Sequence, residues 1–125
     1  MLTNRHSTTM LPVTDVPRAR RFYEEKLGLK ARATLPTGEI EYETDGSTLA
    51  IYPRAEPPKS DHTALSFEVD DIEREVRDLR SRGVEFEHYE MPDAKERDGV
   101  YEMAGTRCAW MKDPDGNILC IHQLH

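Results

Sequence analysis

The stretch LPVTDVPRARRFYEEKLGL, residues 11–29, decides the fold because it joins a short apolar strand to an amphipathic helix. Thr14 or Asp15 can cap the start of this helix, and Gly28 suits its end. Apolar residues recur at helical spacing and fall on one face of it: Val16, Ala19, Phe22, Tyr23 and Leu27. The stretch therefore predicts a strand followed by a helix over residues 14–28.

The second half of the chain repeats this pattern in ALSFEVDDIEREVRDLRSRGV, residues 64–84. Its helix has a narrow apolar stripe, Asp70 with Glu73 resembles a capping box, and Gly83 can end it. Three further strands are predicted after each helix, at 29–35, 39–44 and 48–54 in the first half and at 84–90, 101–112 and 118–123 in the second.

The repeat predicts an α+β fold of two βαβββ modules. One helix covers only one face of its sheet, so we expect the two modules to pair and leave a shared concavity. We interpret residues 1–125 as a single domain, with module 1 at about 5–55, a linker at about 53–61 and module 2 at about 62–125. The charged, proline-containing segment 91–99 is predicted to be a solvated loop.

Composition narrows the classes of partner. Of 125 residues, 37% are hydrophobic and 33% charged, and the net charge is −7, so we expect a soluble protein without a nucleic-acid partner. An acidic chain can instead attract a cationic small molecule. No apolar run suits a membrane span or a secretory signal, and two cysteines suit a reducing compartment. We therefore expect a cytoplasmic protein.

Three stretches resemble the vicinal oxygen chelate superfamily, which includes glyoxalase I, extradiol dioxygenases, fosfomycin-resistance enzymes and bleomycin-resistance proteins. They are 11–29, 64–84 and WMKDPDGNILCI at 110–121, with FY followed by LG and a late DPDGN. The resemblance implies a cupped, eight-stranded mixed sheet with the helices on its outer face. It also implies four inward positions that bind a divalent metal in many members, here occupied by Thr8, Ala50, Ala64 and Cys120.

Two alanines and a threonine do not supply the donors that a divalent metal needs. We therefore expect no metal at the usual positions and no cofactor. One pleat outside those positions lie His6, Tyr52, His62 and His122. The resemblance implies that the first and last strands of each module are antiparallel neighbours, which would place His62 opposite His122 and His6 opposite Tyr52. These histidines could line a pocket, act as bases, or form a displaced metal site of His6, His62 and His122.

The leading hypothesis is a homodimeric, metal-free protein that sequesters a small organic ligand, as bleomycin-resistance proteins do. The alternatives are a metal-dependent lyase or dioxygenase of the glyoxalase type and a structural or regulatory subunit with a vestigial pocket. No catalytic residue is assigned; Cys120 suits a small apolar wall better than a nucleophile. Alternation adds Tyr42 and Met103 as further candidates. The predicted ligand pocket consists of Thr8, Met10, Ala50, Tyr52, His62, Ala64, Ser66, Trp110, Cys120 and His122.

Overall fold

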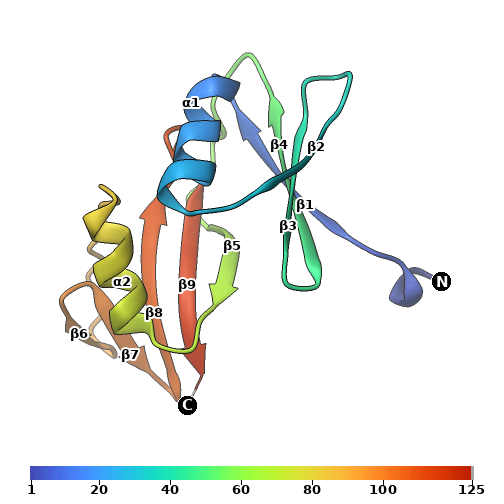
Figure 1. The fold of residues 1–125 in the computed structure, drawn as a ribbon. Coiled ribbons are helices and arrows are strands. Elements are labelled where there is room, and N and C mark those ends of the chain that lie inside the picture. The colour runs from blue at the N-terminus through green and yellow to red at the C-terminus, as the bar shows by residue number, and fades with distance from the viewer. Residues whose placement is uncertain (125) are drawn as a thin grey trace. The chain divides into compact units, whose positions relative to one another are not determined.

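A computed structural model describes residues 1–124 of the chain. The chain divides into two compact units, Met1–Lys59 and the described residues from Ser60 onward. Each unit contains one main helix and one mixed sheet, of four strands in the first unit and five in the second (Figure 1). The predicted α+β class and the repeated order of strand, helix and strands are confirmed.

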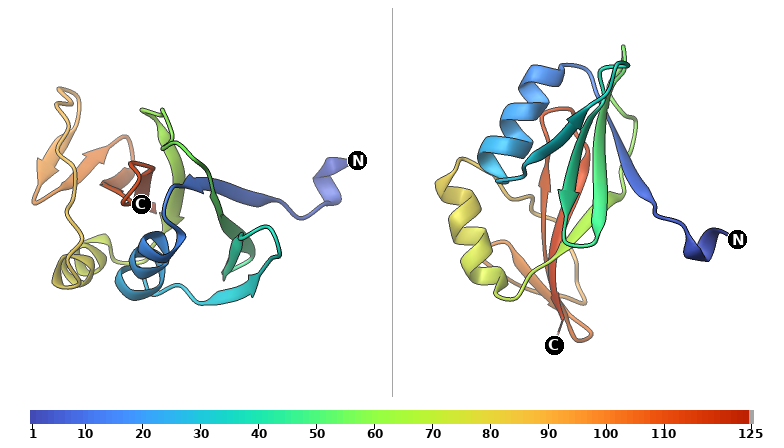
Figure 2. Two further views of the ribbon diagram at one scale, coloured as in Figure 1. Left: turned by 90° about the horizontal axis from the view of Figure 1, so that it is seen from above. Right: turned by 45° about the vertical axis from the view of Figure 1, so that its right-hand side comes forward.

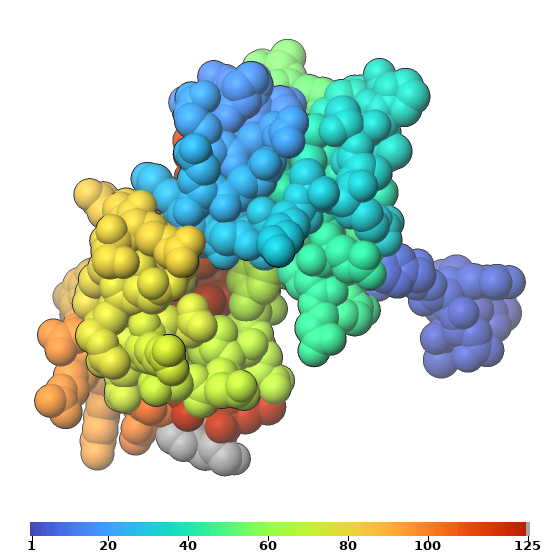
Figure 3. All heavy atoms as spheres, viewed as in Figure 1, coloured from blue at the N-terminus to red at the C-terminus, as the bar shows by residue number. Residues whose placement is uncertain are grey.

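The first unit is built on a sheet with the strand order β1-β4-β3-β2, in which β1 is parallel to β4 and the other pairs are antiparallel. Residues before β1, blue in Figure 3, extend away from the rest of this unit and include a short 3₁₀ turn. The elements are η1 Leu2–Asn4, β1 Thr8–Val13, α1 Val16–Arg20, η2 Arg21–Lys26, β2 Ala31–Thr34, β3 Ile40–Thr44 and β4 Ser47–Pro53.

The helix of the first unit begins where the sequence predicted but widens along its length. Asp15 caps it by accepting a hydrogen bond from the backbone nitrogen of Arg18 at 3.1 Å. Beyond α1 the chain continues as the π-helical segment η2, in which the Leu27 nitrogen donates to the Phe22 carbonyl at 3.0 Å. The adjacent Phe22 and Tyr23 are both buried there.

Tyr42 belongs to the core under this helix, so its prediction as a pocket residue is wrong. Its ring lies 6.1 Å from that of Tyr23, and its hydroxyl donates to Glu24 Oε2 at 2.7 Å. Arg20 donates to the same carboxylate at 2.6 Å and lowers the pKa of Glu24. Alternation along β3 separates its two faces but does not say which of them the helix covers, and Tyr42 lies on the covered face.

The second unit has the strand order β5-β9-β8-β7-β6, with β5 parallel to β9 and the other pairs antiparallel. Its helix α2 lies along one face of this sheet and buries Ile72, Val76 and Leu79, the predicted stripe (Figure 1). The elements of this unit are β5 Thr63–Glu68, α2 Ile72–Ser81, β6 Lys95–Arg97, β7 Val100–Met103, β8 Thr106–Lys112 and β9 Ile118–Leu124.

No helix among residues 1–124 is long and apolar enough to cross a membrane.

The middle of the second unit differs from the prediction. Residues 84–90 form no strand and contribute only an isolated bridge between Phe86 and Met111. The predicted loop at 91–99 contains β6, which forms a hairpin with β7 at the edge of the sheet (Figure 2). Asp98 and Gly99 turn this hairpin with positive φ angles of 54° and 87°. The predicted strand 101–112 is divided in the same way by Ala104 and Gly105.

The cap of α2 lies one residue later than the sequence indicated. Asp71, not Asp70, accepts a hydrogen bond from the Arg74 nitrogen, at 3.2 Å. Gln123 Oε1 in β9 accepts a second helix-terminal hydrogen bond, from the Ile72 nitrogen at 2.9 Å. The capping-box interpretation failed because the contact from β9 fixes Ile72 as the first helical residue.

Replacing Asp71 by alanine removes this cap, and we expect it to lower the free energy of unfolding by about 1 kcal/mol. Asp70→Ala is the matched control, because it removes the same charge one residue away without removing the cap. Urea denaturation of both variants measures the difference. Equal losses in the two variants would contradict the assignment of Asp71 as the cap.

Candidate functional site

Side chains of the second sheet divide into two sets. Gln123 contacts the start of α2, and Arg107 pairs with Glu73 of that helix, so both face α2. Residues that alternate with them point to the opposite side, which we call the distal face of the second sheet. The strand registers place on it Ser66, Glu68, Tyr101, Cys108, Trp110, Cys120 and His122.

A chain of polar side chains crosses β5 and β9 on this face. The parallel register sets Ser66 level with Cys120 and Glu68 level with His122. Ser66 Oγ and His122 Nδ1 are hydrogen-bonded at 2.5 Å, and His122 Nε2 lies 3.8 Å from Glu68 Oε1. The His122 side chain is 24% exposed and that of Glu68 67% exposed, so a ligand can reach both. The group offers a ligand a hydroxyl, an imidazole and a carboxylate.

Aromatic rings lie beside this polar group. The Trp110 ring centroid is 5.5 Å from that of Tyr101 and 5.6 Å from that of Tyr89, both in edge-to-face arrangement. Trp110 Nε1 donates to Thr63 Oγ1 at 3.1 Å, and the Tyr89 nitrogen donates to the Tyr101 hydroxyl at 2.7 Å. These bonds fix the orientation of the rings and leave an aromatic surface next to Cys120, which pairs with Trp110 across the strands.

Sequence reasoning identified Trp110 but missed Tyr89 and Tyr101. Tyr101 lies two residues before Met103, which had been considered by alternation, so the same rule could have found it. Tyr89 could not be found, because it lies in an irregular segment where alternation has no meaning. The Tyr89 hydroxyl oxygen is buried without a hydrogen-bond partner among residues 1–124, a cost of about 1–3 kcal/mol for such a group.

The two cysteines are free thiols in the interior of this face. Burial, with a smaller contribution from Cys120, raises the pKa of Cys108 from 9.0 to about 11. Burial also raises the pKa of Cys120, whose Sγ donates to the Ile121 carbonyl at 3.4 Å. Thiols held in the neutral form are poor nucleophiles, which agrees with the interpretation of Cys120 as an apolar wall.

The predicted pairing of histidines is wrong because the first and last strands of each unit are parallel, not antiparallel. His62 contacts Ser60 and precedes β5, whose Thr63 is level with Ile118. His122 lies about 13 Å beyond Ile118 along β9, at roughly 3.3 Å per residue. His62 lies two residues before Ala64, and His122 lies two residues after Cys120. On parallel strands these two displacements run in opposite directions, so they separate the two histidines instead of bringing them together.

The same correction applies in the first unit. Tyr52 is level with Pro12 rather than with His6. His6 Nε2 is instead hydrogen-bonded to Thr48 Oγ1 at 2.6 Å. The register sets Thr8 level with Thr48 and Met10 level with Ala50. Met10 is 45% exposed, whereas Ala50 is buried.

Residues at the four expected metal positions do not fit a divalent ion. Thr8 and Ala50 offer one hydroxyl, and Ala64 is the extra residue of an irregularity in β5, so Ser66 rather than Ala64 is level with Cys120. The Cys120 thiol is kept protonated by burial. Among residues 1–124 no three or more His, Cys, Asp and Glu side chains gather as a metal site would require.

Comparisons with known proteins give a consistent family. A sequence model of the glyoxalase/bleomycin resistance protein/dioxygenase superfamily matches residues 5–121. No curated protein sequence matches the chain significantly.

Solved structures share the fold at low identity. TnmS3, an antibiotic binding protein from Streptomyces sp. CB03234, has 22% identity, a TM-score of 0.69, and coverage of 100% of this chain and 99% of its own. The fosfomycin resistance protein FosX from Listeria monocytogenes has 15% identity, a TM-score of 0.74, and coverage of 98% and 94%. A glyoxalase/bleomycin resistance protein/dioxygenase from Nocardioides has 20% identity, a TM-score of 0.71, and coverage of 96% and 83%.

The raised thiol pKa values predict slow alkylation of both cysteines in the folded chain. A pKa of about 11 in place of 9.0 for Cys108 lowers its thiolate fraction about a hundredfold near pH 8. Iodoacetamide labelling followed by mass spectrometry should therefore be about a hundredfold slower or more in native protein than in the urea-unfolded chain. A native Cys120 that reacts as fast as the unfolded thiol would restore the nucleophile interpretation.

Proposed function

The chain belongs to the glyoxalase/bleomycin resistance protein/dioxygenase superfamily, and on that basis we propose that it binds and sequesters a small organic molecule without the help of a metal. One observation carries the proposal: a fixed aromatic cluster and a hydrogen-bonded polar group lie together on the distal face of the second sheet. Aromatic walls with few oriented polar groups are typical of ligand sites.

Each part of the distal face has a separate role in binding. Trp110 and Tyr89 supply ring surface on which a planar ligand can pack. Ser66 and His122 hold each other in a fixed orientation, so a ligand that bonds to either loses little side-chain entropy.

Charge favours a cationic ligand. Glu68 presents a largely exposed carboxylate at the end of the polar group, within 3.8 Å of the His122 ring. Aromatic faces attract cations through their quadrupole, most strongly for tryptophan. A net charge of −7 on the whole chain adds long-range attraction. The same face would repel an anionic analogue of the ligand.

Relatives support binding as the general activity. One structural neighbour is described as an antibiotic binding protein and another as a fosfomycin resistance protein. The competing metal-dependent lyase or dioxygenase needed His62 and His122 side by side, and the parallel register of β5 and β9 removes that arrangement. We therefore prefer sequestration of an intact ligand.

Trp110 is the only tryptophan and lies in the proposed site, so its fluorescence should change when a ligand binds. We expect members of a panel of planar aromatic cations, such as acridinium and phenanthridinium salts, to quench it, and their neutral analogues to do so less. His122→Ala should weaken binding of the best member roughly tenfold, the loss of a hydrogen bond to a charged or fixed group.

His6→Ala is the matched control, because it removes the same side chain from the first unit, and its affinity should equal that of the unmodified chain. Calorimetry on Trp110→Phe would show the contribution of the ring itself. If no compound in a chemically broad panel changes the fluorescence or the melting temperature, the interpretation as a subunit with a vestigial pocket replaces this proposal.

We also propose that the chain is a homodimer, as the resemblance implies for such short relatives. Sedimentation equilibrium over a concentration series should give a mass near twice the 14.4 kDa of one chain. A single species of 14.4 kDa at all concentrations would contradict the dimer.

We propose a cytoplasmic location as well, which the free, buried thiols of Cys108 and Cys120 support.

A further inference from the structure

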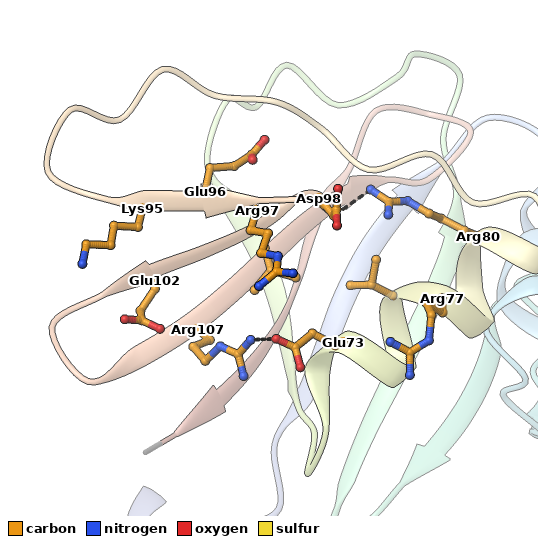
Figure 4. Close-up of a pocket in the computed structure, with 11 residues that line it drawn as sticks. Glu73, Arg77, Arg80, Lys95, Glu96, Arg97, Asp98, Glu102 and Arg107 are labelled. Atoms are coloured by element: carbon orange, nitrogen blue, oxygen red, sulfur yellow. Dashed lines mark hydrogen bonds and ion pairs between the residues drawn. The ribbon is translucent and has the colours of Figure 1, made fainter.

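The side of the second sheet that faces α2 carries a groove unrelated to the distal face. It has a volume of about 520 Å³, within the usual range for small-molecule sites, and opens between α2 and the strands β6, β7 and β8 (Figure 4). Arg107 and Val100 line it, whereas their neighbours Cys108 and Tyr101 point to the distal face. The lining residues are Glu73, Val76, Arg77, Arg80, Lys95, Glu96, Arg97, Asp98, Val100, Glu102 and Arg107.

Charged residues of both signs line this groove, five basic and four acidic, in a chain whose net charge is −7. The acidic residues are Glu73, Glu96, Asp98 and Glu102. In Figure 4, Glu73 and Asp98 lie between the arginines of the helix and those of the strands. The five basic residues are Arg77 and Arg80 on α2, Lys95 and Arg97 on β6, and Arg107 on β8.

Two of the arginines are structural and fix the walls of the groove. Arg107 pairs with Glu73 and so joins β8 to α2. Arg80 Nη2 donates to the Asp98 carbonyl at 2.8 Å, and its guanidinium carbon lies 5.4 Å from the centre of the Phe86 ring. A Cβ atom at Gly99 would lie 2.8 Å from Arg80 Nη2, so glycine there lets the arginine approach the hairpin.

Arg77 and Arg97 have no such role. Neither forms an ion pair with any of residues 1–124 that the structure describes, and both are exposed. Lys95 is level with Glu102 across the hairpin, so its charge is partly balanced. These two arginines therefore line the groove without an ion-pair partner among the described residues, one from the helix and one from the edge strand.

We infer that the groove between α2 and the β6–β7 hairpin binds a small organic dianion, held between the guanidinium groups of Arg77 and Arg97. Guanidinium groups bind carboxylate and phosphate oxygens in pairs, which favours these two anionic groups. Val76 and Val100, which are buried, form the apolar floor of the groove between the two arginines. A second ligand thus binds on the opposite side of the same sheet as the first.

Calorimetric titration of the full chain tests this inference with succinate and malate as dicarboxylates, glycerol 3-phosphate as a phosphate ester, and succinamide and glycerol as neutral controls. We expect saturable binding of at least one dianion at low ionic strength, weakened but retained at physiological ionic strength. The preferred probe distinguishes a carboxylate ligand from a phosphorylated one. Neutral controls should not bind.

Arg77→Gln and Arg97→Gln should each weaken binding of that dianion about tenfold or more, because each loses a charge-assisted interaction. Arg74→Gln is the matched control: it removes the same charge from the same helix but from outside the groove, and it should change the affinity less than about twofold. Thermal denaturation of each variant checks that the fold is retained.

Absence of saturable binding for every dianion would overturn the inference. An equal loss in Arg74→Gln and Arg77→Gln would also overturn it, because it would indicate diffuse attraction rather than a site. His122→Ala should leave dianion binding unchanged, so failure of the distal-face proposal and failure of the groove proposal can be told apart.

Discussion

Parallel pairing of the first and last strands within each unit is the constraint on which the remaining structure depends. In the second unit the chain leaves β5, crosses the sheet through α2, and returns to place β9 beside β5 in the same direction. This direction sets Ser66 level with Cys120 and Glu68 level with His122. An antiparallel pair would have assembled a different group of side chains from the same sequence, with His62 opposite His122.

The alternation of side chains then gives one thin sheet two chemically different surfaces. Tyr101, Cys108 and Trp110 face one way and form an aromatic and thiol-containing surface, while Val100 and Arg107 face α2 and line the groove. Neighbouring residues of one strand point to opposite faces of the sheet, so the same strands β7 and β8 contribute side chains to both proposed sites. The two sites therefore bind ligands of opposite charge but share the same backbone.

Ionic and capping contacts hold the elements together in a chain with few apolar residues. Arg20 and Tyr42 meet at Glu24 in the first unit, and Arg80 joins the β6–β7 hairpin to α2 in the second. These contacts orient helices on sheets whose apolar cores are small, because only 37% of the chain is hydrophobic. Most of the charged residues that the sequence contains are thus on the surface, and a few fix the positions of helices and hairpins.

Local pattern by itself determined much of this protein: both helices, most of the strands and the α+β class follow from periodicity and turn residues, and the resemblance of three stretches, one with the DPDGN motif, indicated the family. The strand predicted at 84–90 and the loop predicted at 91–99 were wrong. Sequence also named Ser66, Trp110, Cys120 and His122, since alternation assigns faces within one strand. Only the tertiary structure decided which residues meet, because strand direction and register depend on contacts between distant segments. Hence the Ser66–His122 bond, the contact of Tyr89 with Trp110, and the charged groove beside α2 could not be predicted from one strand or helix at a time.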